Sequence, residues 1–211
     1  MEPVVVLITV FAVFIPALLL PGPDFVAVVR SSLAYGTSAG LLTTTGVTIG
    51  LTTYATLSLL GLSALLVEYQ WLTWAVRFLG GAYLVYLGVR LLRAKPEAIA
   101  VDTAASIPSG GRALLFGFLV TLTNPKAVVL FASVFATAVT ATTPAWLLAL
   151  MIALVAASAF VWYALVSLFM SSASVVRRFE GAKHWIERSA GCCFVAIGGK
   201  VMTDARNPIS P

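Results

Sequence analysis

Two charged residues directly follow proline-containing interruptions of apolar stretches. Asp24 follows Pro21-Gly22-Pro23, and Lys126 follows Asn124-Pro125. A charge near the centre of a membrane span costs roughly 2.5–3.5 kcal/mol on insertion scales, so such a residue is a functional candidate by default. If both side chains lie deep, they could pair, and the carboxylate could carry a proton or contact a substrate ammonium group. The alternative for Asp24 is structural: it caps the helix that restarts after Pro23.

The prolines should interrupt their helices. Proline lacks a backbone donor and clashes with the carbonyl one turn earlier, so Pro21 and Pro23 should end or kink the first helix, and Pro125 the fourth. Gly22 between the first two allows backbone conformations closed to other residues. In lipid, the freed carbonyls must find partners in protein or cavity water. A single break is often a packing kink, but two matched breaks favour a binding site.

Other polar candidates lie in the second and third apolar segments. Small residues recur at every fourth position, namely Gly36, Gly40, Thr44, Thr48, Thr52 and Thr56. Such rows let helices pack closely, which is the favoured interpretation. A hydroxyl-lined path for a polar solute, including Thr48 and Thr52, is the alternative. Arg77 lies six residues into the third segment; snorkelling to the outer interface is favoured, and binding of a substrate carboxylate is the alternative.

The composition is that of an integral membrane protein. Of 211 residues, 60% are hydrophobic and only 10% are charged, against roughly 25% charged in soluble domains. The net charge of +5 does not indicate nucleic-acid binding, because the basic residues flank apolar spans. The first apolar stretch lacks the basic region and cleavage site of a signal peptide, so we expect it to be retained.

Six segments are long enough to cross a bilayer, which needs roughly 20 apolar residues per helix. Their approximate limits are Val4–Leu20 with an extension past Asp24, Gly40–Leu66, Trp71–Leu92, Ala113–Ala138, Ala145–Met170 and Trp185–Met202. The sequence therefore predicts an all-α polytopic membrane protein with a single transmembrane domain.

The two proline motifs indicate an internal repeat. Pro23 and Pro125 lie 102 residues apart, about half the chain, and each motif is followed by two more spans. Three spans per unit is an odd number, so the second unit must insert upside down. Inverted repeats with interrupted helices mark the binding site of secondary transporters. We expect repeat 1 at about 1–93, a cytoplasmic loop at about 94–112 and repeat 2 at about 113–211; chance recurrence among 10 prolines is the alternative.

The distribution of lysine and arginine predicts the orientation. The connections on one side carry Arg30, Arg90, Arg93, Lys95, Arg112, Arg177, Arg178, Lys183 and Arg188. The short loops on the other side carry none, and that side holds only the C-terminal Lys200 and Arg206. The positive-inside rule places the long basic loops in the cytoplasm and both termini outside.

At these residues the sequence resembles the lysine exporter (LysE) superfamily, and most of all its homoserine/threonine efflux (RhtB-type) family. The resemblance rests on motifs that occur in order along nearly the whole chain. They are Pro21-Gly22-Pro23-Asp24, Ser32-Leu33, Gly36, Gly40-Leu41, Gly46, Gly50, Gly80-Gly81-Ala82-Tyr83-Leu84, Tyr86-Leu87-Gly88, Asn124-Pro125-Lys126-Ala127 and Gly191 to Gly198.

The resemblance implies an exporter of amino acids or small derivatives in the bacterial inner membrane that exchanges them for protons. It implies that the two proline motifs form the central site, with Asp24 and Lys126 as polar members. No cofactor, metal or nucleic acid is implied, and a homo-oligomer is left open. The residues after the second motif, Val129-Leu130-Phe131 and Ala136-Thr137, differ from the aromatic residues and further proline usual in the family, which leaves the substrate open.

Competing functions lack their residues. A thiol-disulfide carrier needs cysteines on separate spans, whereas Cys192 and Cys193 are neighbours, and adjacent cysteines rarely bridge. Metal efflux usually needs clusters of ligands, but His184 is the sole histidine. An enzyme such as an intramembrane protease needs a second buried acid or a serine with a base. A channel or a structural subunit remains the main alternative to an exporter.

Overall fold

The computed structural model describes residues 3–62, 70–94, 111–138, 143–169 and 173–204, and within these ranges it is built from helices. The helices are α1 (Pro3–Leu19), α2 (Pro23–Tyr35), α3 (Thr37–Thr56), the π-helix η1 (Leu57–Leu62), α5 (Gln70–Leu92), α6 (Gly111–Leu122), α7 (Pro125–Ala138), α8 (Ala145–Phe169) and α9 (Ala173–Asp204).

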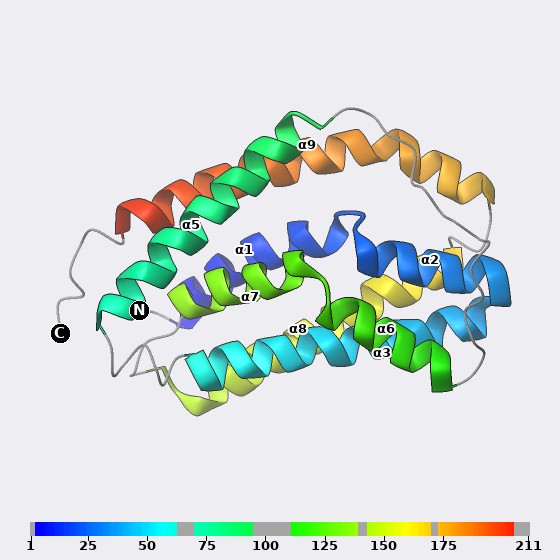
Figure 1. Cartoon of the computed structure of the whole chain (residues 1–211), viewed down its shortest axis with the longest axis horizontal. Coiled ribbons are helices and arrows are strands. Elements are labelled where there is room, and N and C mark those ends of the chain that lie inside the picture. Colours follow the sequence, from blue (N-terminus) through cyan, green and yellow to red (C-terminus); the bar gives the residue numbers. More distant parts are fainter. Residues whose placement is uncertain (1–2, 63–69, 95–110, 139–142, 170–172, 205–211) are drawn as a thin grey trace.

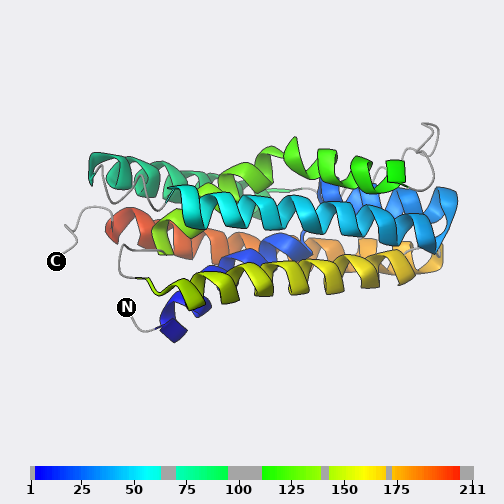
Figure 2. The same cartoon turned by 90° about the horizontal axis from the view of Figure 1, so that it is seen from below.

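The helices run back and forth along one long axis. Taken in order, α1–α2, α3, α5, α6–α7, α8 and α9 alternate in direction, and the N- and C-terminal ends of the chain lie at the same end of the molecule (Figure 1). A view from below shows the same lengthwise alignment (Figure 2). This arrangement suits a bundle whose long axis crosses a bilayer.

The prolines stand at two helix breaks. α1 ends at Leu19 and α2 begins at Pro23, with a bend of 43° between them. α6 ends at Leu122 and α7 begins at Pro125, with a bend of 57°. Both prolines that open a helix occupy its first turn, where the missing amide has no intrahelical partner to lose.

The predicted spans differ in how well they pass a test of length and hydropathy. α8 passes alone, and α1 with α2 and α6 with the first part of α7 pass as bent pairs. α5 contributes a shorter apolar stretch, Phe78–Leu92. The threonines of α3 and the charges of the first half of α9 lower the hydropathy of those helices. The structure thus shows a helical membrane protein, and the arrangement of six spans as a 3+3 repeat remains a prediction.

Two predicted limits need correction. The last apolar segment was expected at Trp185–Met202, but α9 is continuous from Ala173 to Asp204, so the basic stretch before Trp185 is helical rather than a loop. The second was expected at Gly40–Leu66, but α3 begins at Thr37 and passes into η1 at Leu57. Hydropathy marks the apolar part of a helix and misses polar turns that continue it.

Glycines bring two pairs of helices into close contact. A Cβ atom at Gly46 of α3 would lie 2.8 Å from the backbone nitrogen of Phe118 in α6, and one at Gly50 would lie 2.7 Å from the Cβ atom of Thr121. These approaches support the packing interpretation of the small-residue row. Thr44, one turn from Gly40 in that row, donates a hydrogen bond to the Tyr163 carbonyl of α8 at 3.1 Å.

The antiparallel pair α5–α9 is joined by a reciprocal set of glycines (Figure 1). A Cβ atom at Gly88 would lie 2.7 Å from the Gly191 carbonyl oxygen, and one at Gly191 would lie 2.9 Å from the Gly88 carbonyl oxygen. Gly81 and Gly198 face each other in the same way, at 2.8 and 2.7 Å. Any side chain at these four positions would force the two backbones apart.

The two broken helices cross each other in opposite directions. α1 packs against α7, and α2 packs against α6, so the two breaks meet at one level. Other contacts do not follow a two-fold pattern: α5 packs against α7, whereas the matching contact of α9 with α2 is not among the substantial helix contacts of the described residues. The matching contacts that a repeat would give are therefore found at the breaks and not throughout the described helices.

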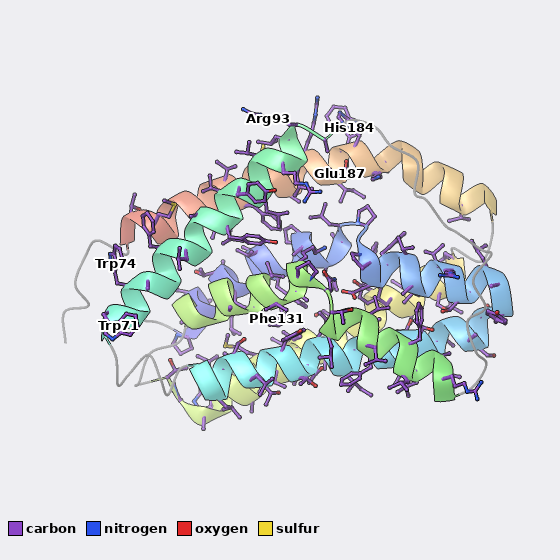
Figure 3. All side chains as sticks on the ribbon, in the orientation of Figure 1. Trp71, Trp74, Arg93, Phe131, His184 and Glu187 are labelled. Atoms are coloured by element: carbon purple, nitrogen blue, oxygen red, sulfur yellow. The ribbon has the colours of Figure 1, made fainter. Side chains whose placement is uncertain are left out.

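An aromatic cluster packs beside the breaks. The Phe14 and Phe131 rings lie 5.7 Å apart, and the Tyr54 ring stacks on Phe131 at 6.1 Å. Phe131, labelled in Figure 3, is fully buried. These rings join α1, α3 and α7 and fix the surroundings of the polar residues at the breaks.

Candidate substrate site at the two helix breaks

The crossing of the broken helices brings the predicted polar residues together. Asp24 lies in the first turn of α2, and Asn124 immediately precedes α7. Both are buried, at 5% and 3% exposure. Because the breaks meet at one level, side chains about 100 positions apart in sequence become neighbours.

The Asp24 carboxylate accepts one hydrogen bond at each oxygen from the other broken helix. Thr121 donates its hydroxyl to Oδ1 at 3.0 Å, and Asn124 donates its amide to Oδ2 at 3.0 Å. The expected alternative, in which Asp24 caps its own helix, does not describe these contacts. Asn124 has the capping role instead, because its Oδ1 accepts the Lys126 backbone amide at 3.1 Å at the start of α7.

Lys126 spans the two breaks without pairing directly with Asp24. Its ammonium group donates to the Ala17 carbonyl oxygen in the last turn of α1 at 2.8 Å. No contact between Lys126 and Asp24 meets the distance of an ion pair among the described residues. The two opposite charges instead line one small cavity, each held by groups of the other broken helix.

Two of the carbonyls at the breaks accept hydrogen bonds from side chains of other helices. Lys126 satisfies Ala17, and the Tyr54 hydroxyl of α3 donates to the Leu122 carbonyl at the end of α6 at 2.7 Å. An unpaired carbonyl in a bilayer interior costs several kcal/mol, so these two side chains stabilise the interrupted helices.

The shared cavity is small and partly polar. Its volume is about 20 Å³, room for roughly one water molecule. Asp24, Asn124, Lys126 and Tyr163 supply its polar lining, and Phe14, Ala17, Leu18, Leu51, Ala127 and Leu130 supply the apolar lining. The described conformation is therefore closed around the charged residues.

Gly22 does not use the conformational freedom expected of it. Its φ and ψ are −145° and −169°, an extended backbone that any residue can adopt. A Cβ atom there would lie 3.5 Å from the Lys126 ammonium nitrogen, an ordinary contact. The expectation of a conformation closed to other residues is wrong for this state, because Pro23 disfavours the helical region for the residue before it and so favours extended backbone at Gly22.

The remaining predicted site residues lie apart from this cavity. The Thr48 hydroxyl is buried with no hydrogen-bond partner among the described residues, and Thr52 donates to the Thr48 carbonyl at 2.7 Å. Neither lines the cavity. Arg77 belongs to α5, but its side chain lies outside the described residues.

Sequence reasoning missed three members of the site, Thr121, Tyr54 and Tyr163. Thr121 lies three residues before Asn124, and residues at that spacing share a helix face. Tyr163 is a buried phenol within the apolar α8, and it lines the cavity. Tyr54 lies within the polar stretch of α3. Each is a polar group at a depth where few occur, which is the signal that could have found them.

Comparisons with known proteins agree with the resemblance in sequence. The family model of LysE type translocators matches residues 15–205. The threonine efflux protein of Escherichia coli strain K12 is 31% identical over 197 residues, covering 90% of this chain and 94% of that protein. The threonine efflux protein of Salmonella typhi is 31% identical over 193 residues, with the same coverage.

A further relative carries no assigned role. An uncharacterized membrane protein of Haemophilus influenzae is 32% identical over 199 residues, covering 91% of this chain and 93% of that protein. No solved structure gives a significant match. The family model spans nearly the whole chain, including both helix breaks, and the alignment with the Escherichia coli threonine efflux protein covers 90% of the chain. The chain therefore belongs to the LysE type translocator family, and it is a transporter rather than an enzyme.

Proposed function

We propose that this protein exports amino acids or small amino-acid derivatives across the bacterial inner membrane, from a central site formed by the two helix breaks. The observation that carries the proposal is the pair of opposite charges, Asp24 and Lys126, in one buried cavity where the broken helices cross. Relatives named threonine efflux proteins cover nearly the whole chain and support the substrate class.

The charges of the site match those of an amino acid. Asp24 is suited to the α-ammonium group, and Lys126 is suited to the α-carboxylate. The positive ends of α2 and α7 both point to the site, since each helix begins at its break, and such helix ends favour a carboxylate. Asn124 and Tyr163 add neutral hydrogen-bonding groups.

The described cavity is too small for an amino acid, so export requires a rearrangement. Lys126 must leave the Ala17 carbonyl, or Asp24 must leave Thr121 and Asn124, before a substrate can take their place. We propose that the closed state described here alternates with states open to one side, as in transporters with discontinuous helices. Arg77, Thr48 and Thr52 remain candidates for contacts made in those states.

Asp24 is also the proposed proton carrier. A carboxylate that exchanges a substrate ammonium group for a proton stays neutralised in both halves of a cycle, which avoids an uncompensated charge in the bilayer interior. Proton antiport follows if substrate and proton compete for this one group.

The proposed topology is six spans in a 3+3 inverted repeat with the basic loops in the cytoplasm. The alternating directions of the helices and the shared end of the two termini support it (Figure 1). Fusion of a periplasm-active reporter to the C-terminus should give activity, and a cytoplasm-active reporter should not; the opposite result would reverse the orientation.

An efflux assay tests the function. Cells loaded with amino-acid-rich dipeptides should release at least one common amino acid faster when they contain the protein. Release at the rate of cells without it, for every common amino acid, would contradict the proposal. A conductance without exchange would favour a channel.

Asp24→Asn tests the site and the coupling. It should abolish acceleration of efflux by an inward proton gradient in proteoliposomes, because the amide cannot exchange a proton. Ser158→Ala is the control, since that exposed-face hydroxyl bonds only to carbonyls of its own helix α8. Coupling that persists in Asp24→Asn would return Asp24 to a structural role.

A further inference from the structure

A larger cavity lies away from the helix breaks, between the end of α5 and the middle of α9. Its volume is about 520 Å³. The charged residues that line it are Arg90 and Arg93 on the α5 side and Lys183 and Glu187 on α9. Figure 3 shows Arg93 and Glu187 near each other where α5 ends against α9.

Glu187 is the unusual member of this set. It exposes only 8% of its surface. Its Oε1 atom lies 3.7 Å from the Lys183 ammonium nitrogen, whereas its Oε2 atom is buried with no hydrogen-bond partner among the described residues. A buried carboxylate oxygen is normally satisfied. Glu187 lines the cavity, so its unpaired oxygen indicates a partner that reaches this side chain from the cavity after a small side-chain movement.

The two arginines that line the cavity are exposed cations, whereas Glu187 is a buried anion. Arg90 and Arg93 are exposed, and they lie three residues apart, on one face of the end of α5. Guanidinium groups bind carboxylates through two parallel hydrogen bonds. The cavity therefore offers donors for an anionic group and, at Glu187 Oε2, an acceptor for a cationic one.

We propose that this cavity binds a small zwitterion, with an anionic group at Arg90 and Arg93 and an ammonium group at Glu187, and that this zwitterion is the exported amino acid on the cytoplasmic side. The inference rests on the proposed function and its orientation. Arg90 and Glu187 lie at the cytoplasmic ends of the predicted third and sixth spans, so the site would load substrate before it reaches the closed central cavity.

A phospholipid with an ethanolamine headgroup carries the same pair of charges. Both sources share the chemistry of an anionic group and an ammonium group a few bonds apart, and basic pockets at the cytoplasmic side of membrane proteins do bind headgroups. We favour the amino acid for two reasons. The cavity is large enough for a whole small molecule, and an amino acid is the substrate of the proposed export.

The test uses the full-length protein in everted membrane vesicles, in which the cytoplasmic face is outside. The KM for uptake of labelled L-threonine is compared between wild type, Glu187→Gln, Arg93→Gln and the control Arg188→Gln. Arg188 is exposed, adjacent to Glu187 in sequence, and does not line the cavity. Loss of one charged contact at a partly exposed site should raise KM by about three- to tenfold. The maximal rate should stay the same, since the central site is intact.

A binding measurement separates this site from transport. Purified protein in lipid nanodiscs is titrated with L-threonine and with N-acetyl-L-threonine, which lacks the ammonium charge. Glu187→Gln should weaken binding of threonine by the same factor and leave binding of the acetylated compound unchanged. A purely structural role of Glu187 would alter both compounds alike.

Three results would overturn the inference. One is that Glu187→Gln and Arg93→Gln have the same KM and the same affinity for threonine as the control Arg188→Gln. Absence of threonine binding by the wild type and all three variants counts as this result. Another is an equal effect of Glu187→Gln on both compounds. The third is that Glu187→Gln weakens the binding of phosphatidylethanolamine added to phosphatidylglycerol nanodiscs but leaves the affinity for threonine unchanged. Failure of the proposed function would differ, because cells would release no amino acid even if the purified cavity bound threonine through Glu187.

Discussion

Gly50→Ala tests whether the packing of α3 on α6 holds the central site. The added Cβ atom would lie 2.7 Å from the Thr121 Cβ atom and 2.8 Å from its Cγ2 atom, where ordinary contact begins at 3.4 Å. The first of these atoms is attached to the backbone of α6, so α6 must move by several tenths of an ångström. A shift of that size stretches the 3.0 Å hydrogen bond from Thr121 to Asp24 beyond useful length.

Two opposing effects set the magnitude. Overpacking costs about 1–3 kcal/mol, and replacing glycine with alanine within a helix contributes about 0.5–1 kcal/mol of stability. The clash dominates, so Gly50→Ala should lower the free energy of unfolding by about 1–2 kcal/mol. At about 2–4 °C per kcal/mol for a chain of this size, the thermal midpoint should fall by about 2–8 °C.

The assay is the thermal midpoint of purified protein, followed by loss of the monodisperse peak in size-exclusion chromatography. Gly199→Ala in α9 is the matched control, because a Cβ atom there meets nothing within 4 Å. It should keep or raise the midpoint. Thr121→Val removes the hydroxyl without a clash. We expect both Thr121→Val and Gly50→Ala to export less amino acid, because each weakens or loses the hydrogen bond from Thr121 to Asp24. A midpoint for Gly50→Ala equal to or above that of Gly199→Ala would refute the packing argument.

Three further substitutions follow from contacts at the breaks. Tyr54→Phe leaves the Leu122 carbonyl without its donor and should lower the free energy of unfolding by about 1–3 kcal/mol. The control Tyr86→Phe, at an exposed position, should leave the free energy of unfolding unchanged, and an equal thermal midpoint for both variants would contradict a stabilising role of the Tyr54 hydroxyl. Lys126→Met removes the donor to the Ala17 carbonyl and the cation that lines the cavity with Asp24, so efflux should be lost. The control Lys200→Met, at an exposed position, should export normally, and normal efflux by Lys126→Met would show that Lys126 is not part of the site. Gly22→Ala meets only an ordinary contact in an extended backbone, so its thermal midpoint should match that of the wild type, and a fall as large as that of Gly50→Ala would show a requirement for glycine in the closed state.

The interruptions of the helices could be predicted from sequence because their cause is local. The ends at Leu19 and Leu122 lie just before Pro21, Pro23 and Pro125, which lack the backbone donor that a continuing helix needs, whereas the single Pro16 lies within α1 without ending it. The charged residues next to them were candidates for the same reason.

The contacts between the breaks could not be predicted, because they depend on how two distant helices cross. Pairing of Asp24 with Lys126 was one possibility if both lay deep. In the structure, Thr121 and Asn124 instead donate to Asp24, and Lys126 donates to the Ala17 carbonyl. Which donors reach the carboxylate depends on how the helices cross in three dimensions, and sequence periodicity holds no such information.

The polar extensions of helices were also beyond hydropathy. α9 continues through a charged stretch because its residues form helices well and part of it packs on α5, whereas a span search responds to apolar residues only. The π-helix η1 likewise has no proline or glycine pattern that sets it apart from the turns before it.

The reciprocal glycine contacts fix the position of α5 relative to α9. Gly81 and Gly88 meet Gly198 and Gly191 in only one register, and sliding α5 by one helical turn, about 5.4 Å, would press side chains into the partner's carbonyl groups. Sliding of α5 along α9 is therefore blocked, and the two helices should move together as one rigid body during a transport cycle. The bending that opens the central cavity must then occur at the two proline breaks and at the other helix contacts. The charged cavity between α5 and α9 should keep its shape.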